Sequence, residues 1–593
     1  MRSTTSSNEV RTILRDNFKQ FWTVPAFGLF WLLVWGFVPA ILTQSDNSIY
    51  EEFSMNMNPG YVIGMLILAV ASGMTVFSYL QNPSSANYIH SLPVSRGKLF
   101  GANVLSGLLM IAGPILVNGI LMSILAGNLL FIKWMAVTLI CCFAIFAITV
   151  FAALVSGNTL MHLFNTAFFN GLFTVLLLVF IGVCENLLVG FETPDAIMTL
   201  ILKSNALTAA VGNGVSRVLI CGIYIVVGIV ALLVGWAVYR RRPIERSGNS
   251  VIFTWTRAVL FLVCVFCGSI LAGLFSATIM SQNTRIGFDH FMVIGIIIGA
   301  RIGFVIGSLM IDRSAKIFTR RNMLPAAVAL VLAFAVSASV SADVLGYSSN
   351  VPDAKDVKAV YVDTQGSFLF NSYDEDGSGF PFRGASIYYQ KMEPTAMISD
   401  YTVPGLVSEE SIYAVTKLQR NLIDQDAKDK SYADSVRIIY ELKNGKTIRR
   451  EYDVYMKTEG EFAAADIDPA IREAAGALYD SKEFKQVYSL NNLRPEYFEK
   501  GTVTYQPDPY GEEDDGYYAI PKQYVKGLKE AMEKDFQECG YEQSMRCKGI
   551  VSVSRNGVSR EDDNYYDEVI EIPIPKTAKH TNAWLKEHKN LLK

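Results

Sequence analysis

The stretch FMVIGIIIGARIGFVIGSLMI, residues 291–311, decides the class of fold, because Arg301 is its only charged residue. An α-helix of about 20 apolar residues is long enough to cross a hydrocarbon core of about 30 Å. Runs of this kind recur through the first 346 residues of the sequence and do not occur after them. We predict nine membrane spans, at residues 22–43, 61–80, 101–125, 133–156, 163–184, 217–239, 256–280, 291–311 and 323–343.

Composition divides the chain in the same way. Of 593 residues, 51% are hydrophobic and 18% are charged, and the mean hydropathy is +0.28. This is too apolar for an ordinary soluble protein and too charged for a chain that is membrane throughout. Basic residues predominate before residue 347 and acidic residues after it. The sequence therefore predicts a polytopic α-helical membrane part and an acidic soluble domain that does not bind nucleic acid.

Clusters of Lys and Arg indicate which loops face the cytoplasm, because short cytoplasmic loops are enriched in these residues. Four such clusters fall on one predicted side of the membrane. They are Arg2, Arg11, Arg15 and Lys19 before span one; Arg96 and Lys98 after span two; Arg240, Arg241, Arg242 and Arg246 after span six; and Arg313, Lys316, Arg320 and Arg321 after span eight. We expect a cell-membrane protein with a cytoplasmic N-terminus, a first span retained as an anchor, and an extracellular C-terminal domain. Residues 185–216 leave an alternative open, since they could contain a re-entrant helix or an additional span, and an additional full span would invert the topology downstream of it.

The loop YIHSLPVSRGKLF, residues 88–100, joins spans two and three on the predicted cytoplasmic side. One interpretation is a membrane-entry turn, in which Pro93 ends a helix and Arg96 and Lys98 are ordinary cytoplasmic anchors. The other interpretation is a docking element for a cytoplasmic partner. Its candidate contact residues are Tyr88, His90, Leu92, Pro93, Arg96, Lys98 and Phe100.

The segment Ser91-Leu92-Pro93-Val94, followed by Arg96 and Leu99-Phe100, resembles the coupling segment of bacterial ABC-transporter permeases. The similar proteins are six-helix exporters of the Gram-positive type that carry a large extracellular C-terminal domain. Three further stretches are similar to that family: the amphipathic segment from Asn8 to Trp22, the hairpin sequence around Asn444-Gly445, and the closing EIPIPKTAKHTNAWLKEH.

The resemblance implies a domain order and a set of partners. It implies an interfacial elbow helix at residues 1–21, a six-span core at 22–240, a three-span extension at 241–346 and the extracellular domain at 347–593. An ATPase subunit would dock at the cytoplasmic loop, and a second permease, identical or different, would complete the membrane part. The chain has no G-x-x-x-x-G-K-[ST] motif. We therefore expect it to be no enzyme and to bind no cofactor, with ATP and Mg on the partner ATPase.

The family implies export or removal of an envelope-active compound, such as a peptide antibiotic. The alternative function is a membrane sensor or scaffold, whose outer domain binds an envelope ligand and signals to a cytoplasmic partner without transport. Both functions require contact at the first cytoplasmic loop. A membrane-anchored enzyme would need a reactive pocket, and the sequence offers no motif for one.

Two features of span eight stand out. Gly295, Gly299, Gly303 and Gly307 recur every four residues and form a smooth stripe, which predicts close approach of another helix, within the chain or across a dimer. Arg301 lies near the middle of the same span, about 200° around the helix from Gly299. An ionised side chain at this depth favours a functional position or a buried pair, with snorkelling to an interface as the alternative and Glu185 as one candidate partner.

The C-terminal domain is predicted to be mixed α/β. Alternating runs such as VKAVYVDT and SVRIIYEL indicate strands, and SEESIYAVTKLQRNLIDQ indicates a helix. The acidic segment 508–518 could separate two lobes. Cys539 and Cys547 could form a disulfide in an oxidising compartment, whereas no Cys/His spacing predicts a metal site.

Overall fold

The computed structural model describes most of the chain. The described residues are 2–38, 59–126, 130–206, 217–281, 288–312, 318–364, 372–373, 379–380, 405–425, 430–457, 467–492, 498, 501–507, 518–544, 547–555 and 568–591. They form two compact units. The first unit contains residues 1–183 and 194–338, and the second contains residues 184–193 and 339–593.

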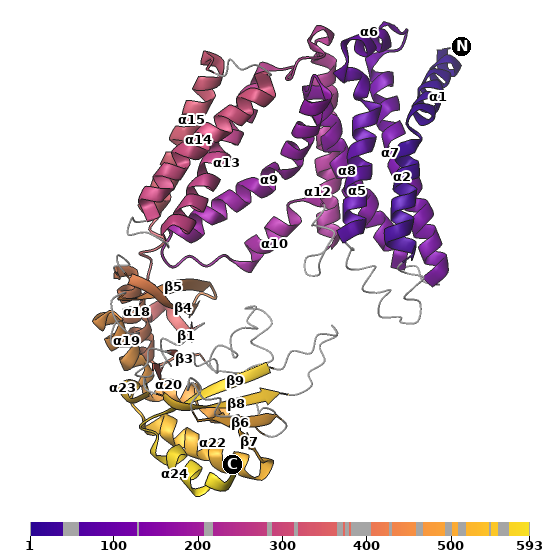
Figure 1. Cartoon of the computed structure of the whole chain (residues 1–593). Coiled ribbons are helices and arrows are strands. Elements are labelled where there is room, and N and C mark those ends of the chain that lie inside the picture. Colours follow the sequence, from indigo (N-terminus) through magenta and orange to yellow (C-terminus); the bar gives the residue numbers. More distant parts are fainter. Residues whose placement is uncertain are drawn as a thin grey trace. The chain divides into compact units, whose positions relative to one another are not determined.

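The N-terminal half of the chain is helical (Figure 1). Its elements are α1 (Arg2–Phe21), α2 (Thr23–Leu32), the π-helical turn η1 (Leu33–Phe37), α5 (Pro59–Val76), η2 (Ser78–Gln81), α6 (Pro83–Ser91), α7 (Arg96–Ala126), α8 (Leu130–Val155), α9 (Thr159–Leu187), α10 (Asp195–Lys203), α12 (Arg217–Arg241), η3 (Ile244–Arg246), α13 (Thr254–Ser281), α14 (Phe288–Asp312) and α15 (Arg320–Ser341).

Seven of the described helices, α7, α8, α9, α12, α13, α14 and α15, are long and apolar enough to cross a membrane. They match seven of the nine predicted spans. The first two predicted spans correspond to shorter apolar helices, Thr23–Trp35 and Gly60–Val76, and the connection 39–58 lies outside the described residues. The length and composition of these helices therefore fit a membrane-embedded protein, while the count of nine spans remains a prediction. In the loop at 185–216, α10 has 9 residues, about 14 Å of helix, which is too short to span.

Helix α8 is the most buried of the seven membrane-length helices, and it contacts α5, α7 and α12. Its inward side chains include Cys142, Ile145, Phe146 and Val150, which are at most 2% exposed. The small residue Gly107 on α7 leaves room for the Phe146 ring, since a Cβ atom there would overlap it. Close packing of apolar side chains holds helices together in a membrane, because the lipid provides no hydrophobic driving force between them.

The glycine stripe of α14 packs against α13. A Cβ atom at Gly299 would lie 2.6 Å from the Cβ of Ala272, and one at Gly303 would lie 3.1 Å from the carbonyl oxygen of Cys264. A side chain at Gly295 would collide with the hydroxyl of Ser276. The two backbones approach closely because these positions lack side chains. The contact lies within one chain, between helices that follow one another in sequence.

The second unit contains both strands and helices. Its elements are η4 (Ala354–Asp356), β1 (Val357–Thr364), β2 (Ser372–Tyr373), β3 (Gly379–Phe380), α18 (Glu409–Asp424), β4 (Lys430–Leu442), β5 (Thr447–Lys457), α19 (Pro469–Tyr479), α20 (Lys482–Val487), η6 (Leu490–Asn492), β6 (Thr502–Gln506), β7 (Tyr518–Ile520), α22 (Lys522–Glu538), α23 (Tyr541–Ser544), β8 (Cys547–Arg555), β9 (Glu568–Pro575), α24 (Lys579–Glu587) and η7 (Lys589–Leu591).

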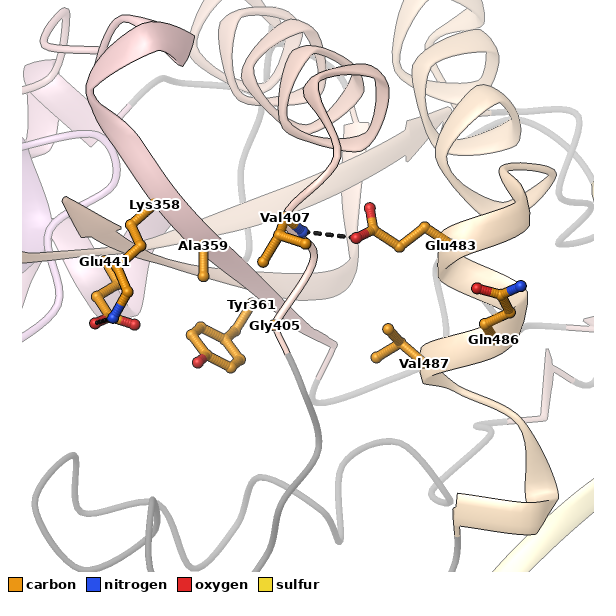
Figure 2. Close-up of a pocket in the computed structure, with 9 residues that line it drawn as sticks. All are labelled: Lys358, Ala359, Tyr361, Gly405, Val407, Glu441, Glu483, Gln486 and Val487. Carbon is orange, nitrogen blue, oxygen red and sulfur yellow. Dashed lines mark hydrogen bonds and ion pairs between the residues drawn. The ribbon is translucent and has the colours of Figure 1, made fainter. Parts of the chain in front are cut away.

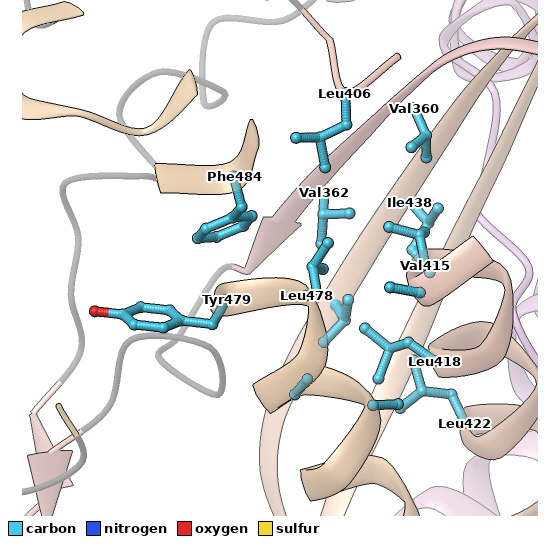
Figure 3. Close-up of a cluster of buried hydrophobic side chains, with 14 of the residues drawn as sticks. Val360, Val362, Leu406, Val415, Leu418, Leu422, Ile438, Leu478, Tyr479 and Phe484 are labelled. Atoms are coloured by element: carbon cyan, nitrogen blue, oxygen red, sulfur yellow. The ribbon is translucent and has the colours of Figure 1, made fainter. Parts of the chain in front are cut away.

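The first lobe of this unit is an antiparallel sheet in the order β1-β4-β5, covered by α18 and α19 (Figure 1). The predicted hairpin forms, with Glu441 opposite Thr447 and with Gly445 at φ +80° in the turn. A glycine suits that left-handed conformation. Between the sheet and the helices lies an apolar core (Figure 3) that includes Val360, Leu418 and Ile438, each fully buried.

The second lobe is a sheet in the order β7-β6-β8-β9, with α22 and α24 packed around a second core. Here the sequence prediction of the boundary is wrong. Strands β6 and β7 pair with each other, Val503 opposite Ile520, so the acidic segment 508–518 connects two strands of one lobe. The chain passes between the lobes before β6. Charge and proline content marked a loop correctly, but they could not show that its two ends pair.

Residues 184–193, which follow most of α9, belong to the second unit. The guanidinium Nε of Arg437 on β4 lies 3.2 Å from a carboxylate oxygen of Glu192. Gly190, at φ +76°, lies against the Tyr452 ring, which leaves no room for a Cβ atom. The Phe191 and Tyr347 rings are 5.6 Å apart. The chain thus contributes a short segment from between two membrane helices to the folded C-terminal domain.

Candidate partner-docking surface

Helix α6 is built by local signals in its sequence. The Asn82 side chain accepts a hydrogen bond from the backbone N–H of Ser84 at 3.0 Å, and Pro83 occupies the first helical position. Both residues are typical of a helix start. The helix ends at Ser91, since Pro93 favours an extended conformation at Leu92 (ψ 146°). A nine-residue polar helix therefore lies between the apolar helices α5 and α7.

His90 ties α6 to the end of α12. Its Nδ1 lies 2.8 Å from the carbonyl oxygen of Ala86, which can only accept, so Nδ1 carries the proton. Its Nε2, 3.0 Å from the Tyr239 hydroxyl, then accepts, and Tyr239 in turn accepts from the Tyr79 hydroxyl at 3.1 Å. Burial lowers the pKa of His90, which favours the neutral ring that this arrangement requires.

Arg96 and Lys98, predicted as partner contacts, are held by the chain itself. One Nη of Arg96 donates to the carbonyl oxygens of Arg240 at 3.1 Å and Tyr239 at 3.3 Å, where α12 ends without further helical donors. Lys98 pairs with Glu9 of α1 at 2.9 Å. Phe100 packs against Trp236 and Tyr239. These side chains connect α6 and α7 to α1 and α12, so contacts within the chain already engage Arg96, Lys98 and Phe100.

The remaining candidate residues are exposed. Tyr88 is 66% exposed and Leu92 is 37% exposed, and Ser91 and Pro93 are also exposed. We call Tyr88, Ser91, Leu92 and Pro93 the α6 surface. It combines an aromatic ring, an aliphatic side chain and a proline. The hydrogen bonds of His90 and Arg96 to the end of α12 hold this part of the chain in place. A rigid apolar patch with a polar margin is the kind of surface that protein partners use.

Arg242 is the residue here that the sequence analysis misjudged, because we interpreted it only as a cytoplasmic anchor. It is 3% exposed. Its two Nη atoms donate to four carbonyl oxygens, of Leu80, Ala153, Leu154 and Ser156, at 2.6 to 2.9 Å. It therefore joins the ends of α8, η2 and α12 behind α6. The only hint in the sequence is its place as the third arginine of a run, directly before Pro243.

Other intramembrane polar groups have partners within the chain. Asn118 donates to the carbonyl oxygen of Leu32 at 2.7 Å, and Asn165 donates to Ser156 Oγ at 2.7 Å. The buried His162 ring contacts the carbonyl oxygen of Thr149 at 2.9 Å. Each links two elements of the first unit.

Arg301 is placed differently. It is exposed on α14, on the side away from the glycine stripe and α13, and within the described chain it forms no hydrogen bond or ion pair. The predicted partner Glu185 is instead hydrogen-bonded to the Thr193 hydroxyl.

The second unit contains an open pocket of about 430 Å³ beside strand β1 (Figure 2). Its charged groups are already engaged, since Lys358 pairs with Glu441 at 2.6 Å and Glu483 accepts from the Val407 N–H at 2.8 Å. Tyr361 and Val487 supply its apolar walls. Among the described residues that line it, no nucleophile lies beside a base. Within the described part of the chain, no group of His, Cys, Asp and Glu side chains is arranged to hold a metal ion.

Cys539 is a free, buried thiol at the end of α22, with its Sγ 3.7 Å from Thr577 Oγ1. Burial raises the pKa of this thiol. The Cys547 side chain lies outside the described residues, so the disulfide between the two cysteines stays a prediction.

We compared the chain with models of protein families, with curated proteins and with solved structures, and none of them matches it.

Proposed function

We propose that this chain is the membrane-spanning permease subunit of an ABC transporter. A separate ATPase chain would bind the α6 surface on the cytoplasmic side and couple ATP hydrolysis to export or removal of an envelope-active compound. A second permease, identical or different, would complete the membrane part. The second unit would then lie outside the cell.

The observation that carries the proposal is the construction of α6. A short polar helix lies between two apolar ones, and Tyr88 on it and Leu92 directly after it are exposed. His90 connects this helix to the end of α12, and Arg96 connects the start of α7 to the same place. A displacement of α6 by a bound partner would be transmitted to α12 through the hydrogen bond between His90 and Tyr239. A simple membrane-entry turn would need no such connection. The seven apolar helices supply the membrane part that the proposal requires.

Co-purification from the native membrane tests the proposal. The variant to compare with wild type is Tyr88→Ser, Leu92→Asp, because both side chains are exposed and neither is part of the support for α6. Arg96 is left unchanged, since its loss would also damage the end of α12. The matched control is Tyr413→Ser, Leu345→Asp, whose side chains are 63% and 95% exposed in the second unit.

We expect an ATPase chain with a phosphate-binding loop to co-purify with wild type and with the control, and to be lost from the α6 variant while that variant still inserts. If no such ATPase accompanies the wild-type protein in mild detergent with nucleotide present, the permease function is wrong. In that case the sensor or scaffold function becomes the better proposal.

A further inference from the structure

The face of α14 that points away from α13 carries one charge in an apolar surface. Around Arg301 lie four exposed aliphatic side chains at helical spacing, which are Ile294, Ile297, Ile298 and Val305, between 37% and 49% exposed. The glycine stripe, about 180° away on average, is covered by α13. The face around Arg301 is therefore the outward face of the helix pair.

Arg301 lies deep within the apolar segment. The segment that can cross a membrane runs from His290 to Leu309, so Arg301 is about 16 Å from one end and about 12 Å from the other. The Cα–Cβ bonds of a helix tilt toward its N-terminus, and this directs the Arg301 side chain away from the nearer end. Snorkelling to that interface is thus disfavoured by both distance and direction.

The chain itself offers no counter-ion at this depth. Among the residues that the structure describes, Arg301 has no ion pair, and the segments of the seven helices that can cross a membrane, 290–309 in α14, contain a single carboxylate, Glu185 near the end of α9. A second copy of the chain would bring the same set of residues. Pairing two copies through this face would place one Arg301 near another without an acid between them.

We infer that this face of α14 packs, inside the membrane, against a helix of a different protein chain that presents an aspartate or glutamate at mid-membrane. A charged side chain in hydrocarbon is stable only when it faces protein or water, and a carboxylate on a neighbouring helix satisfies the guanidinium with two parallel hydrogen bonds. The flanking isoleucines and valine supply the apolar contact around that pair. The inference does not depend on the proposed transport function, because it holds equally for a sensor complex.

Photo-crosslinking in the native membrane tests this inference on the full-length protein. A photoreactive amino acid replaces Ile298 or Val305 beside Arg301, and in the control it replaces Val226, an exposed residue on α12. We expect an adduct with one other membrane chain from positions 298 and 305, and not from position 226. The adduct should fall at least tenfold in Arg301→Leu and persist in Arg301→Lys.

The partner's sequence gives the decisive step. Its apolar segment must carry an Asp or Glu, replacing that acid by Leu must reduce the adduct as Arg301→Leu does, and Arg301→Glu combined with acid→Arg must restore it. The inference is overturned if positions 298 and 305 yield only lipid adducts or a second copy of this chain. It is also overturned if the captured chain has no such acid, or if Arg301→Leu leaves the adduct unchanged.

Discussion

The basic residues at the α6–α7 corner and the basic residue in the middle of α14 have opposite surroundings. Arg96, Lys98 and Arg242 each find acceptors within the chain, in two cases the carbonyl oxygens of helix ends. Arg301 lies among exposed aliphatic side chains with no acceptor in the described chain. An arginine whose hydrogen-bond acceptors lie in its own chain stabilises the fold. An arginine on an apolar helix face with no acceptor in the described chain indicates a contact with another molecule. The predictions below test this distinction.

The largest effect is expected at Arg242. Arg242→Met removes the donor to four carbonyl oxygens, of which that of Ala153 keeps a hydrogen bond from Gln81 at 3.4 Å. Each group left unsatisfied costs about 1–3 kcal/mol, although such costs do not add fully. We expect the melting temperature of the purified protein to fall by on the order of 10 °C. Size-exclusion profiles and thermal unfolding in detergent measure this.

Two matched variants accompany Arg242→Met. Arg241→Met removes an exposed neighbouring charge. Arg301→Leu removes a charge that has no partner among the described residues, so both variants should leave the melting temperature nearly unchanged. If Arg301→Leu destabilises the isolated protein as much as Arg242→Met does, the contrast between the two regions is lost.

The glycine stripe should give the next largest effect. Gly299→Leu forces a side chain into the backbone of α13, and overpacking of this kind costs about 1–3 kcal/mol. The melting temperature should fall by several degrees. Gly113→Ala on α7 is the control, because no atom lies within 4 Å of its added Cβ. Equal melting temperatures of the two variants would mean that α14 does not pack against α13 through its glycines.

Within the α6–α7 corner, two variants should separate support from docking. Arg96→Met removes a donor from the end of α12 and should destabilise the protein by about 1 kcal/mol. Leu92→Asp changes only an exposed side chain and should leave the melting temperature unchanged while reducing the amount of co-purified ATPase. Thermal unfolding and quantitative blotting of the same preparations check both. The reverse pattern would show that the assigned roles are exchanged.

The smallest effect concerns a carboxylate that the chain satisfies. Burial acts to raise the pKa of Glu483, but the hydrogen bonds that it accepts from Ser408 and the Val407 N–H outweigh burial, and the pKa is lowered. Its stabilising contribution is therefore full above the ordinary value of 4.5 and is lost as the pH falls through the lowered value.

Glu483→Gln should accordingly lower the melting temperature by about 1–3 °C near neutral pH, with the difference from wild type shrinking in acid. Thermal unfolding across a pH series measures this. Glu410→Gln, an exposed substitution on α18, is the control and should show no such convergence. A difference for Glu483→Gln that is constant with pH would mean that its charge is not stabilised by the fold.

Much of the fold could be predicted from the sequence because its signals are local. Apolar runs gave the seven membrane-length helices, Asn444-Gly445 gave the hairpin turn, and alternating residues gave β1 and β4. Long-range pairing was not visible. The partners of Arg96 and Arg242 come from α12 and α8, which lie far away in the sequence, so these arginines read as ordinary loop charges. For the same reason, the pairing of β6 with β7 across an acidic loop was missed.

Exposure was the other missing information. The sequence identified the loop 88–100 as a candidate docking element, but it could not rank its residues. The structure separates them into side chains that hold the loop, His90 and Arg96, and side chains that it presents, Tyr88 and Leu92. The sequence counted Arg96 and Lys98 among the candidate contacts because a cation in a loop is usually solvated.

The most direct test of the central claim is ATP hydrolysis by the chain reconstituted in liposomes with the ATPase that co-purifies with it. The account predicts that hydrolysis rises above that of the ATPase alone with wild type and with the Tyr413→Ser, Leu345→Asp control, and stays at the lower rate with Tyr88→Ser, Leu92→Asp. Equal stimulation by the wild type and the α6 variant would contradict a coupling role for the α6 surface.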